Sequence, residues 1–139
     1  MINTKDVIRM KVPYPNVSSE LAATTHMYIC KENTNFHYEF IKCQTLKPYM
    51  LINNPMQHYC DENVDITRNP FQRATRIDCD KIFVTATVKY DDMLKTTTRP
   101  DVSEELFTDV LLELNTDGYM TISLNENELK NLNPLITDI

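Results

Sequence analysis

Residues that could carry catalysis are scattered along this chain and form no compact motif. The three histidines, His26, His37 and His58, stand apart, and no Ser-His-Asp or Cys-His set can be assembled from their spacing. Twenty acidic residues are present, but no two stand out as the carboxylate pair of a glycosidase. Gly118 is the single glycine, so the glycine-rich loops that cradle nucleotide phosphates are excluded. The sequence therefore excludes dinucleotide-binding and nucleotide-hydrolysing folds.

The cysteines offer little support for a metal centre. Cys30, Cys43, Cys60 and Cys79 lie 13, 17 and 19 residues apart, so no pair has the CxxC spacing typical of zinc sites. In a chain without a signal peptide, buried free thiols are the favoured interpretation, and a metal site that uses Cys60 and His58 is the minor alternative. We predict no metal site and no cofactor.

Charge is unevenly distributed along the chain. The net charge of −6 disfavours a protein that binds nucleic acid over its whole surface. Residues 66–89 nevertheless hold five basic residues against Asp78 and Asp80, whereas residues 101–139 hold Lys130 against nine acids. A local basic face on an acidic protein can still contact a phosphate backbone.

The elements that must position these residues are mainly strands in the first half of the chain. Polar and apolar side chains alternate over residues 6–12, 26–31 and 35–43, which predicts strands of a sheet with one buried face. Residues 16–25 are predicted to form a mobile loop long enough to bind a ligand, and residues 32–35 a hairpin turn.

The second half of the chain mixes strands with helices. Residues 46–70 are predicted to be irregular, with 57–69 as an insertion or flexible loop, and further strands are expected within 74–85 and 88–90. A helix is predicted from about residue 102 to 115, with Asp101 or Ser103 as its N-cap and one apolar stripe. The stripe consists of Leu106, Phe107, Val110, Leu111 and Leu114. A C-terminal extension, 119–139, should add a short strand and a helix over 126–132.

These elements predict one mainly β domain over residues 1–139 with one or two helices. The length allows a single modest core. No apolar run approaches the roughly 18 residues of a membrane span, and the N-terminus lacks a signal-peptide pattern. We expect a cytoplasmic protein that does not contact a membrane.

The order of strands and short motifs over residues 6–114 resembles the PemK/MazF family of toxin endoribonucleases. The likeness consists of an Asp-hydrophobic strand that ends at proline (Asp6 to Pro13), a mobile loop, a strand ending at Thr45, an Ile77–Ile82 strand with Asp and Lys, and a helix introduced by Ser103 and acids. This resemblance implies a small SH3-like β-barrel with a C-terminal helix. It also implies a homodimer that cleaves single-stranded RNA without a metal and is neutralised by a cognate antitoxin protein.

The resemblance also implies a set of site residues. Thr45 matches the family's Thr or Ser at the end of the third strand, where its hydroxyl could bond a phosphate oxygen, and Lys47 would add charge nearby. Arg73 and Arg76 could supply further positive charge on the RNA-facing side. Glu20, in the loop, could act as a base. Tyr14, at the loop entrance, could stack on an unpaired base.

The chain departs from the family where an Arg-Pro pair should open the second strand. Thr25-His26-Met27 stands there, so the arginine expected to act on the scissile phosphate is missing. Two interpretations remain open. His26 could substitute as general acid or base, because its ordinary pKa lies near neutrality. Alternatively, the chain is a binding module, or a phage or plasmid accessory protein, that binds RNA or protein without cleavage.

Overall fold

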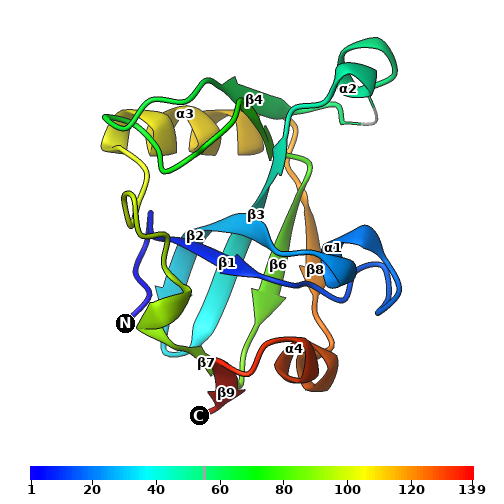
Figure 1. The fold of residues 1–139 in the computed structure, drawn as a ribbon, viewed down its shortest axis with the longest axis vertical. Helices are drawn as coiled ribbons and strands as arrows, with labels where there is room; N and C mark the ends of the chain where they lie inside the picture. The colour runs from blue at the N-terminus through cyan, green and yellow to red at the C-terminus, as the bar shows by residue number, and fades with distance from the viewer. Residues whose placement is uncertain (55) are drawn as a thin grey trace.

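The computed structural model describes residues 1–54 and 56–139, and within them the strands form one large sheet and one small ribbon (Figure 1). The strands are β1 (Val7–Met10), β2 (His26–Thr34), β3 (His37–Thr45), β4 (Tyr59–Glu62), β5 (Thr75–Asp78), β6 (Lys81–Thr85), β7 (Val88–Tyr90), β8 (Met120–Ser123) and β9 (Ile136–Asp138). The helices are α1 (Glu20–Ala23), α2 (Pro48–Ile52), α3 (Glu104–Leu114) and α4 (Glu126–Leu132), with a short 3₁₀ turn at Asp92–Leu94. No helix in these residues is long and apolar enough to cross a bilayer.

The large sheet is built around the long strand β3. Its first half pairs with β6 and its second half with β5, while β2 runs antiparallel along its other side. The strand order is β1-β2-β3-β5-β4, and β8 adds to β6 in parallel. The predicted mainly β class is confirmed. In the described residues the strand pairings end at β1, β4 and β8, and the outer side of β1 makes only isolated bridges, from Asp6 to Asp101 and from Ile8 to Lys95, so a closed barrel is not observed.

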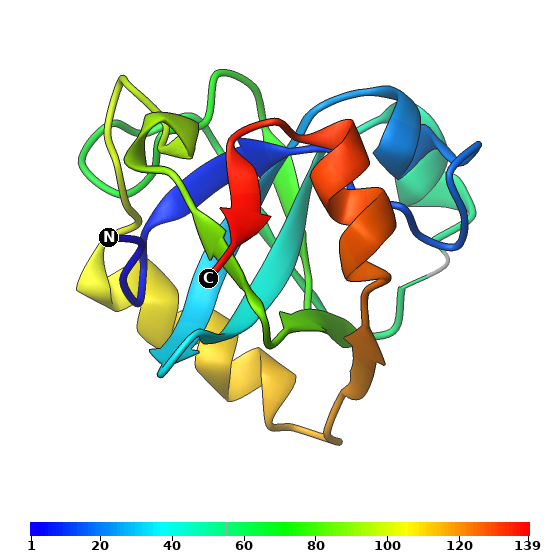
Figure 2. The ribbon, with the colours of Figure 1, turned by 90° about the horizontal axis from the view of Figure 1, so that it is seen from below.

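Both faces of this sheet are buried, whereas the alternating pattern predicted one. On β1, Val7 joins one apolar cluster and Ile8 joins the other. Helix α3 covers the first face, and the β7–β9 ribbon with α4 covers the second; Figure 2 shows the sheet between these two layers. Some polar residues of the alternating pattern are themselves buried and form ion pairs there. The Lys42 ammonium, for example, lies 3.4 Å from the fully buried Asp78 carboxylate. One-sided burial was therefore wrong because local alternation does not reveal what the rest of the chain places on each face.

Helix α3 begins and packs as predicted. The Ser103 hydroxyl accepts a hydrogen bond from the backbone N–H of Leu106, which caps the helix and fixes its first turn. Four of the five stripe residues are buried against the sheet, and Leu111 packs against the same cluster while partly exposed. Helix α4 and strand β8 match the predicted extension, whereas β9 was not predicted. Leu129 of α4 and Ile136 of β9 fill the second core.

Two segments predicted to be irregular contain regular structure. Residues 57–69 include β4, which pairs with β5, so this segment is part of the sheet and the prediction of a flexible insertion was wrong for it. Pro55, inside the predicted irregular region, lies outside the described residues. The predicted loop 16–25 contains the short helix α1, whose Leu21 and Ala22 are buried. The hairpin turn narrows to Asn35 and Phe36, both with positive φ.

Candidate functional site

A groove of three adjoining hollows runs across the part of the α3-bearing sheet face that the helix does not cover. The central hollow, about 180 Å³, is lined by residues of β1, β2, β3 and β5 and by residues 71–73. It shares Arg9, Met27 and Gln72 with a second hollow of about 210 Å³, the threonine hollow, which reaches Thr96–Thr98. It shares His26 and Thr45, with Thr25 and Gln44, with a third hollow of about 290 Å³, the lysine hollow, which reaches Glu20 and Lys47.

Strand register explains the central hollow. Arg9 lies opposite Met27, and Met27 lies opposite Cys43, so these three residues form a row across β1, β2 and β3. Thr45 lies opposite Thr75 in the neighbouring pair of strands. This row belongs to the face that buries α3, but α3 lies further along the sheet, so side chains beyond its reach line a hollow.

The central hollow is lined by cationic and neutral polar groups. Arg9 and Arg73 are exposed, and neither makes an ion pair with another described residue. Among the described residues that line this hollow, none is acidic. Guanidinium groups without carboxylate partners keep their two-point geometry available to a phosphate.

His26 lies at the border between the central and lysine hollows, in a defined tautomer. Its Nδ1 lies 3.1 Å from the carbonyl oxygen of Thr24. A carbonyl can only accept, so Nδ1 carries the proton and Nε2 of the neutral ring keeps a lone pair. Burial lowers the pKa of His26 below its usual value, and the nearby Lys42 and Lys47 act in the same direction. A neutral imidazole with a free Nε2 has the form that a general base needs.

Thr45 and Arg73 both line the central hollow, and hydrogen bonds join the two segments that carry them. The Thr75 hydroxyl donates to the Arg73 carbonyl at 2.8 Å, which ties the 71–73 segment to the start of β5. Leu46 N–H donates to the Ala74 carbonyl at 2.8 Å, which holds the end of β3 against the same segment. The two segments therefore form one hydrogen-bonded part of the sheet.

The lysine hollow joins two further predicted residues. Glu20, at the start of α1, lies 3.5 Å from the ammonium group of Lys47, which precedes α2. Both side chains are about half exposed, at 59% and 48%, so the contact is an open surface pair. Lys47 thus adds charge beside the groove, although Glu20 partly neutralises it.

Two predicted RNA-binding residues lie away from the groove. Arg76 is 2% exposed, and its guanidinium donates to both Asp61 carboxylate oxygens at 2.8 Å and to the Met50 carbonyl at 3.0 Å. It also stacks on the Tyr59 ring, 3.8 Å from its centroid. With these partners Arg76 is a structural residue, and its predicted contact with RNA was wrong.

Tyr14 is the second of these residues. Its ring packs against Phe83 with centroids 5.3 Å apart, and it joins the apolar cluster on the opposite face of the sheet from the central hollow. A ring held in that cluster does not face the groove. The predicted stacking of Tyr14 on a base therefore does not fit this geometry.

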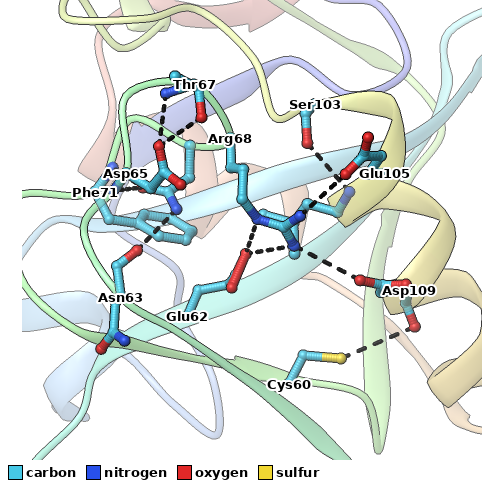
Figure 3. A network of polar contacts seen from close by, with 12 residues as sticks. Cys60, Glu62, Asn63, Asp65, Thr67, Arg68, Phe71, Ser103, Glu105 and Asp109 are labelled. Carbon is cyan, nitrogen blue, oxygen red and sulfur yellow. Dashed lines mark hydrogen bonds and ion pairs between the residues drawn. The ribbon is translucent and has the colours of Figure 1, made fainter.

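The loop that leads to Arg73 is fixed by another arginine, Arg68. Its guanidinium donates to Glu62 at 2.8 Å and lies 3.5 Å from Glu105 and 3.6 Å from Asp109 on α3 (Figure 3). The Arg68 carbonyl accepts from Ser103 N–H, which joins the loop to the start of the same helix. These contacts hold residues 62–71 between β4 and α3 and so place the groove wall that follows them.

The minor alternative of a metal site at His58 and Cys60 is not supported by the contacts. His58 Nδ1 lies 3.1 Å from Glu113 and Nε2 lies 2.9 Å from Asp117, so both ring nitrogens already have carboxylate partners. The Cys60 thiol contacts the Asp109 carbonyl instead. The predicted burial of the thiols holds for Cys30, Cys43 and Cys79, whereas Cys60 is half-buried.

Sequence reasoning missed Arg9, Gln44 and Gln72 as groove residues. For Arg9 the signal lies in the structure and not in the sequence, because it is the exposed residue of a strand whose other members are buried. Its side chain lies on the sheet face that packs against α3, at a place that the helix does not cover. Gln44 and Gln72 carried no comparable signal, since exposed glutamines are ordinary.

No protein-family model, curated protein or solved structure matches the chain. The resemblance to PemK/MazF toxins thus depends on the motifs quoted above, and the function has to be argued from the groove itself.

Proposed function

We propose that the groove binds single-stranded RNA and that the protein is a metal-independent endoribonuclease. The observation that carries this proposal is the convergence of His26, Thr45 and Arg73 on one hollow. These residues are separated by 19 and 28 positions in the sequence, yet all three line the central hollow together with Arg9. A general base, a hydroxyl donor and two free guanidinium groups are the parts that phosphodiester cleavage requires.

The shape and charge of the groove favour an extended polyanion as its ligand. Three adjoining hollows suit a chain of nucleotides better than one compact molecule. Arg9 and Arg73 at the centre and Lys47 at one end offer positive charge along the path. Thr45 and Gln44 add neutral donors that can bond phosphate or base edges. On a protein of net charge −6, this local basic path would concentrate the affinity for RNA in the groove.

In the proposed reaction, His26 Nε2 removes the proton from a ribose 2′-hydroxyl. The 2′-oxygen attacks the adjacent phosphorus, and the bond from phosphorus to the 5′-oxygen breaks. The leaving 5′-oxygen takes a proton from water, which gives a 2′,3′-cyclic phosphate and a 5′-hydroxyl end. Arg9 and Arg73 would stabilise the charge that develops on the phosphate oxygens, and Thr45 would donate to one of them.

The PemK/MazF resemblance extends this proposal to the biological role. It suggests an mRNA interferase of a toxin–antitoxin system, acting in the cytoplasm as a homodimer and inhibited by a cognate antitoxin. Arg9 supports the comparison, because it lies opposite Met27 and so brings a guanidinium next to the place where the family's Arg-Pro arginine is missing. The same charge would come from the neighbouring strand.

The second candidate function is a binding module that holds RNA without cutting it. One observation favours it: beside the arginines, His26 and Cys43 are the titratable groups among the described residues that line the central hollow. Burial raises the pKa of the Cys43 thiol, so it stays protonated and does not act as a base. A site with one acid–base group is weaker than the acid–base pair that efficient phosphoryl transfer uses.

An RNA-cleavage assay on the purified protein tests the proposal. A long unstructured RNA is incubated with the full chain and a chelator between about pH 5 and 8, and the product ends are identified by mass spectrometry. We expect cyclic phosphate ends. A base must be deprotonated, so the rate should rise with pH through a pKa below the usual value of about 6.5 and then level off.

Variants separate the two candidates. His26→Ala should lower the cleavage rate by about a hundredfold or more with little change in RNA affinity. His37→Ala is the matched control, because His37 lies on the paired strand at the opposite end from the groove and should leave cleavage unchanged. RNA binding without cleavage by the wild-type protein would identify a binding module. Absence of both would remove the groove as an RNA site.

A further inference from the structure

A cluster of possible metal ligands lies at the hairpin end of β2 and β3, remote in sequence and register from the groove. Glu32 and Glu39 are directly opposite each other in the strand pairing, and His37 lies two residues before Glu39 on the same face. One ligand atom from each of these residues lies within 4.8 Å of the other two. Two ligands at i and i+2 on one strand and a third across the ladder form a compact three-point set.

The distances are close to those that a bound ion requires. His37 Nε2 lies 3.0 Å from a Glu39 carboxylate oxygen. In a tetrahedral site with metal–ligand bonds of about 2.0–2.2 Å, neighbouring ligand atoms are separated by about 3.3 Å. An ion could therefore replace the Nε2 proton between these two groups with a small side-chain movement. Glu32 would complete a set of one imidazole and two carboxylates, with the remaining positions open to water.

Existing contacts explain how the cluster is held in the absence of an ion. Two carboxylates directly opposite each other on a sheet repel. Lys31 offsets this repulsion, since its ammonium lies 3.1 Å from Glu39. The His37 ring, whose Nε2 lies 3.0 Å from the same carboxylate, adds a second contact that holds it in place.

We infer that Glu32, His37 and Glu39 form a binding site for a divalent transition-metal ion that clamps β2 to β3. The mixed nitrogen and oxygen ligands suit zinc and its spectroscopic substitute cobalt better than calcium or magnesium, which prefer oxygen alone. The Glu39 side chain is 15% exposed and His37 is 44% exposed, so the site is sheltered but open to an entering ion. This site is independent of the proposed reaction in the groove.

Metal titration of the full chain tests the inference. After removal of metals with a chelator, Zn²⁺ is titrated by calorimetry and Co²⁺ by its visible absorption. We expect one ion per chain. His37→Ala should weaken binding by at least about a hundredfold, since the loss of even a supporting residue costs about 10–100-fold. Lys31→Met removes the competing ammonium and should strengthen binding several-fold.

Controls make the result decisive. His58→Ala removes another partly exposed histidine, whose nitrogens already contact Glu113 and Asp117, and should leave affinity unchanged. Glu32→Gln keeps the size of the side chain and provides a second ligand variant if His37→Ala fails to fold. Zn²⁺ should also raise the Tm of the wild-type protein and not that of Glu32→Gln. No binding by the wild type, or an affinity equal to that of the wild type in both His37→Ala and Glu32→Gln, would overturn the site.

Discussion

Four of the five arginines of this protein fall into two regions that use the same side chain in opposite ways. On one side of the sheet edge, Arg68 and Arg76 are surrounded by carboxylates, which fix loop 62–71 and strand β4. In the groove, Arg9 and Arg73 are exposed and make no ion pair with another described residue. A charge that is neutralised within the protein stabilises the fold, whereas an unpaired charge can bind a ligand. The two regions meet at residues 71–76, where three positions separate the exposed Arg73 from Arg76, which is paired with Asp61.

Replacement of Arg76 should produce the largest effect. Arg76→Met keeps an apolar stem but leaves Asp61 and the Met50 carbonyl without their donor. Loss of one partner of a buried ion pair costs about 3–5 kcal/mol, and partial exposure of Asp61 reduces this to about 2–4 kcal/mol. Urea unfolding measures the change. Arg73→Met is the matched variant and should shift the free energy of unfolding by less than about 0.5 kcal/mol. Equal losses in the two variants would erase the distinction between the regions.

Loss of a groove arginine should affect binding and leave the fold intact. Arg9→Met and Arg73→Met should each weaken RNA affinity several-fold and reduce the slope of log affinity against log salt by about 0.7, the value for one phosphate contact on a single strand. Fluorescence anisotropy at several salt concentrations measures both quantities. Lys89→Met is the control, because Lys89 is the exposed residue of β7, lines none of the three hollows, and its loss changes the net charge by the same amount. If Lys89→Met weakened RNA affinity as much as the groove variants do, binding would depend on the net charge of the protein and not on the groove.

Sequence patterns were sufficient for most elements and insufficient for the roles of single arginines. Alternation and capping located β1, β2, β3, α3 and α4, because those signals are local. The burial of both sheet faces and the existence of β4 depend on long-range pairing, which alternation does not encode. Arg73 and Arg76 are both arginines in similar local sequences. Only the strand register of the folded protein places Arg76 opposite Asp61 and leaves Arg73 at the groove. The convergence of His26 with Arg73 was expected from the family resemblance, whereas Arg9 became visible only through its register with Met27.

The smallest expected effect is an opposite pH response of one histidine from each region. Hydrogen bonding to Glu113, with Asp117 nearby, raises the pKa of His58, whereas burial lowers the pKa of His26. NMR titration of the ring signals should place His58 above and His26 below the usual value of about 6.5. Stability from His58 is therefore complete below the pKa of the unfolded chain and is lost as pH rises through the higher folded value. The contribution of His26 to stability has the opposite pH dependence, because folding disfavours its charged form and stability falls as pH drops below about 6.5.

His58→Gln should remove the pH dependence of stability that comes from His58 and leave that from His26 unchanged. Titration of both histidines on the same side of 6.5 would show that the groove does not hold His26 neutral, and His26 would then lose its assigned role as the base.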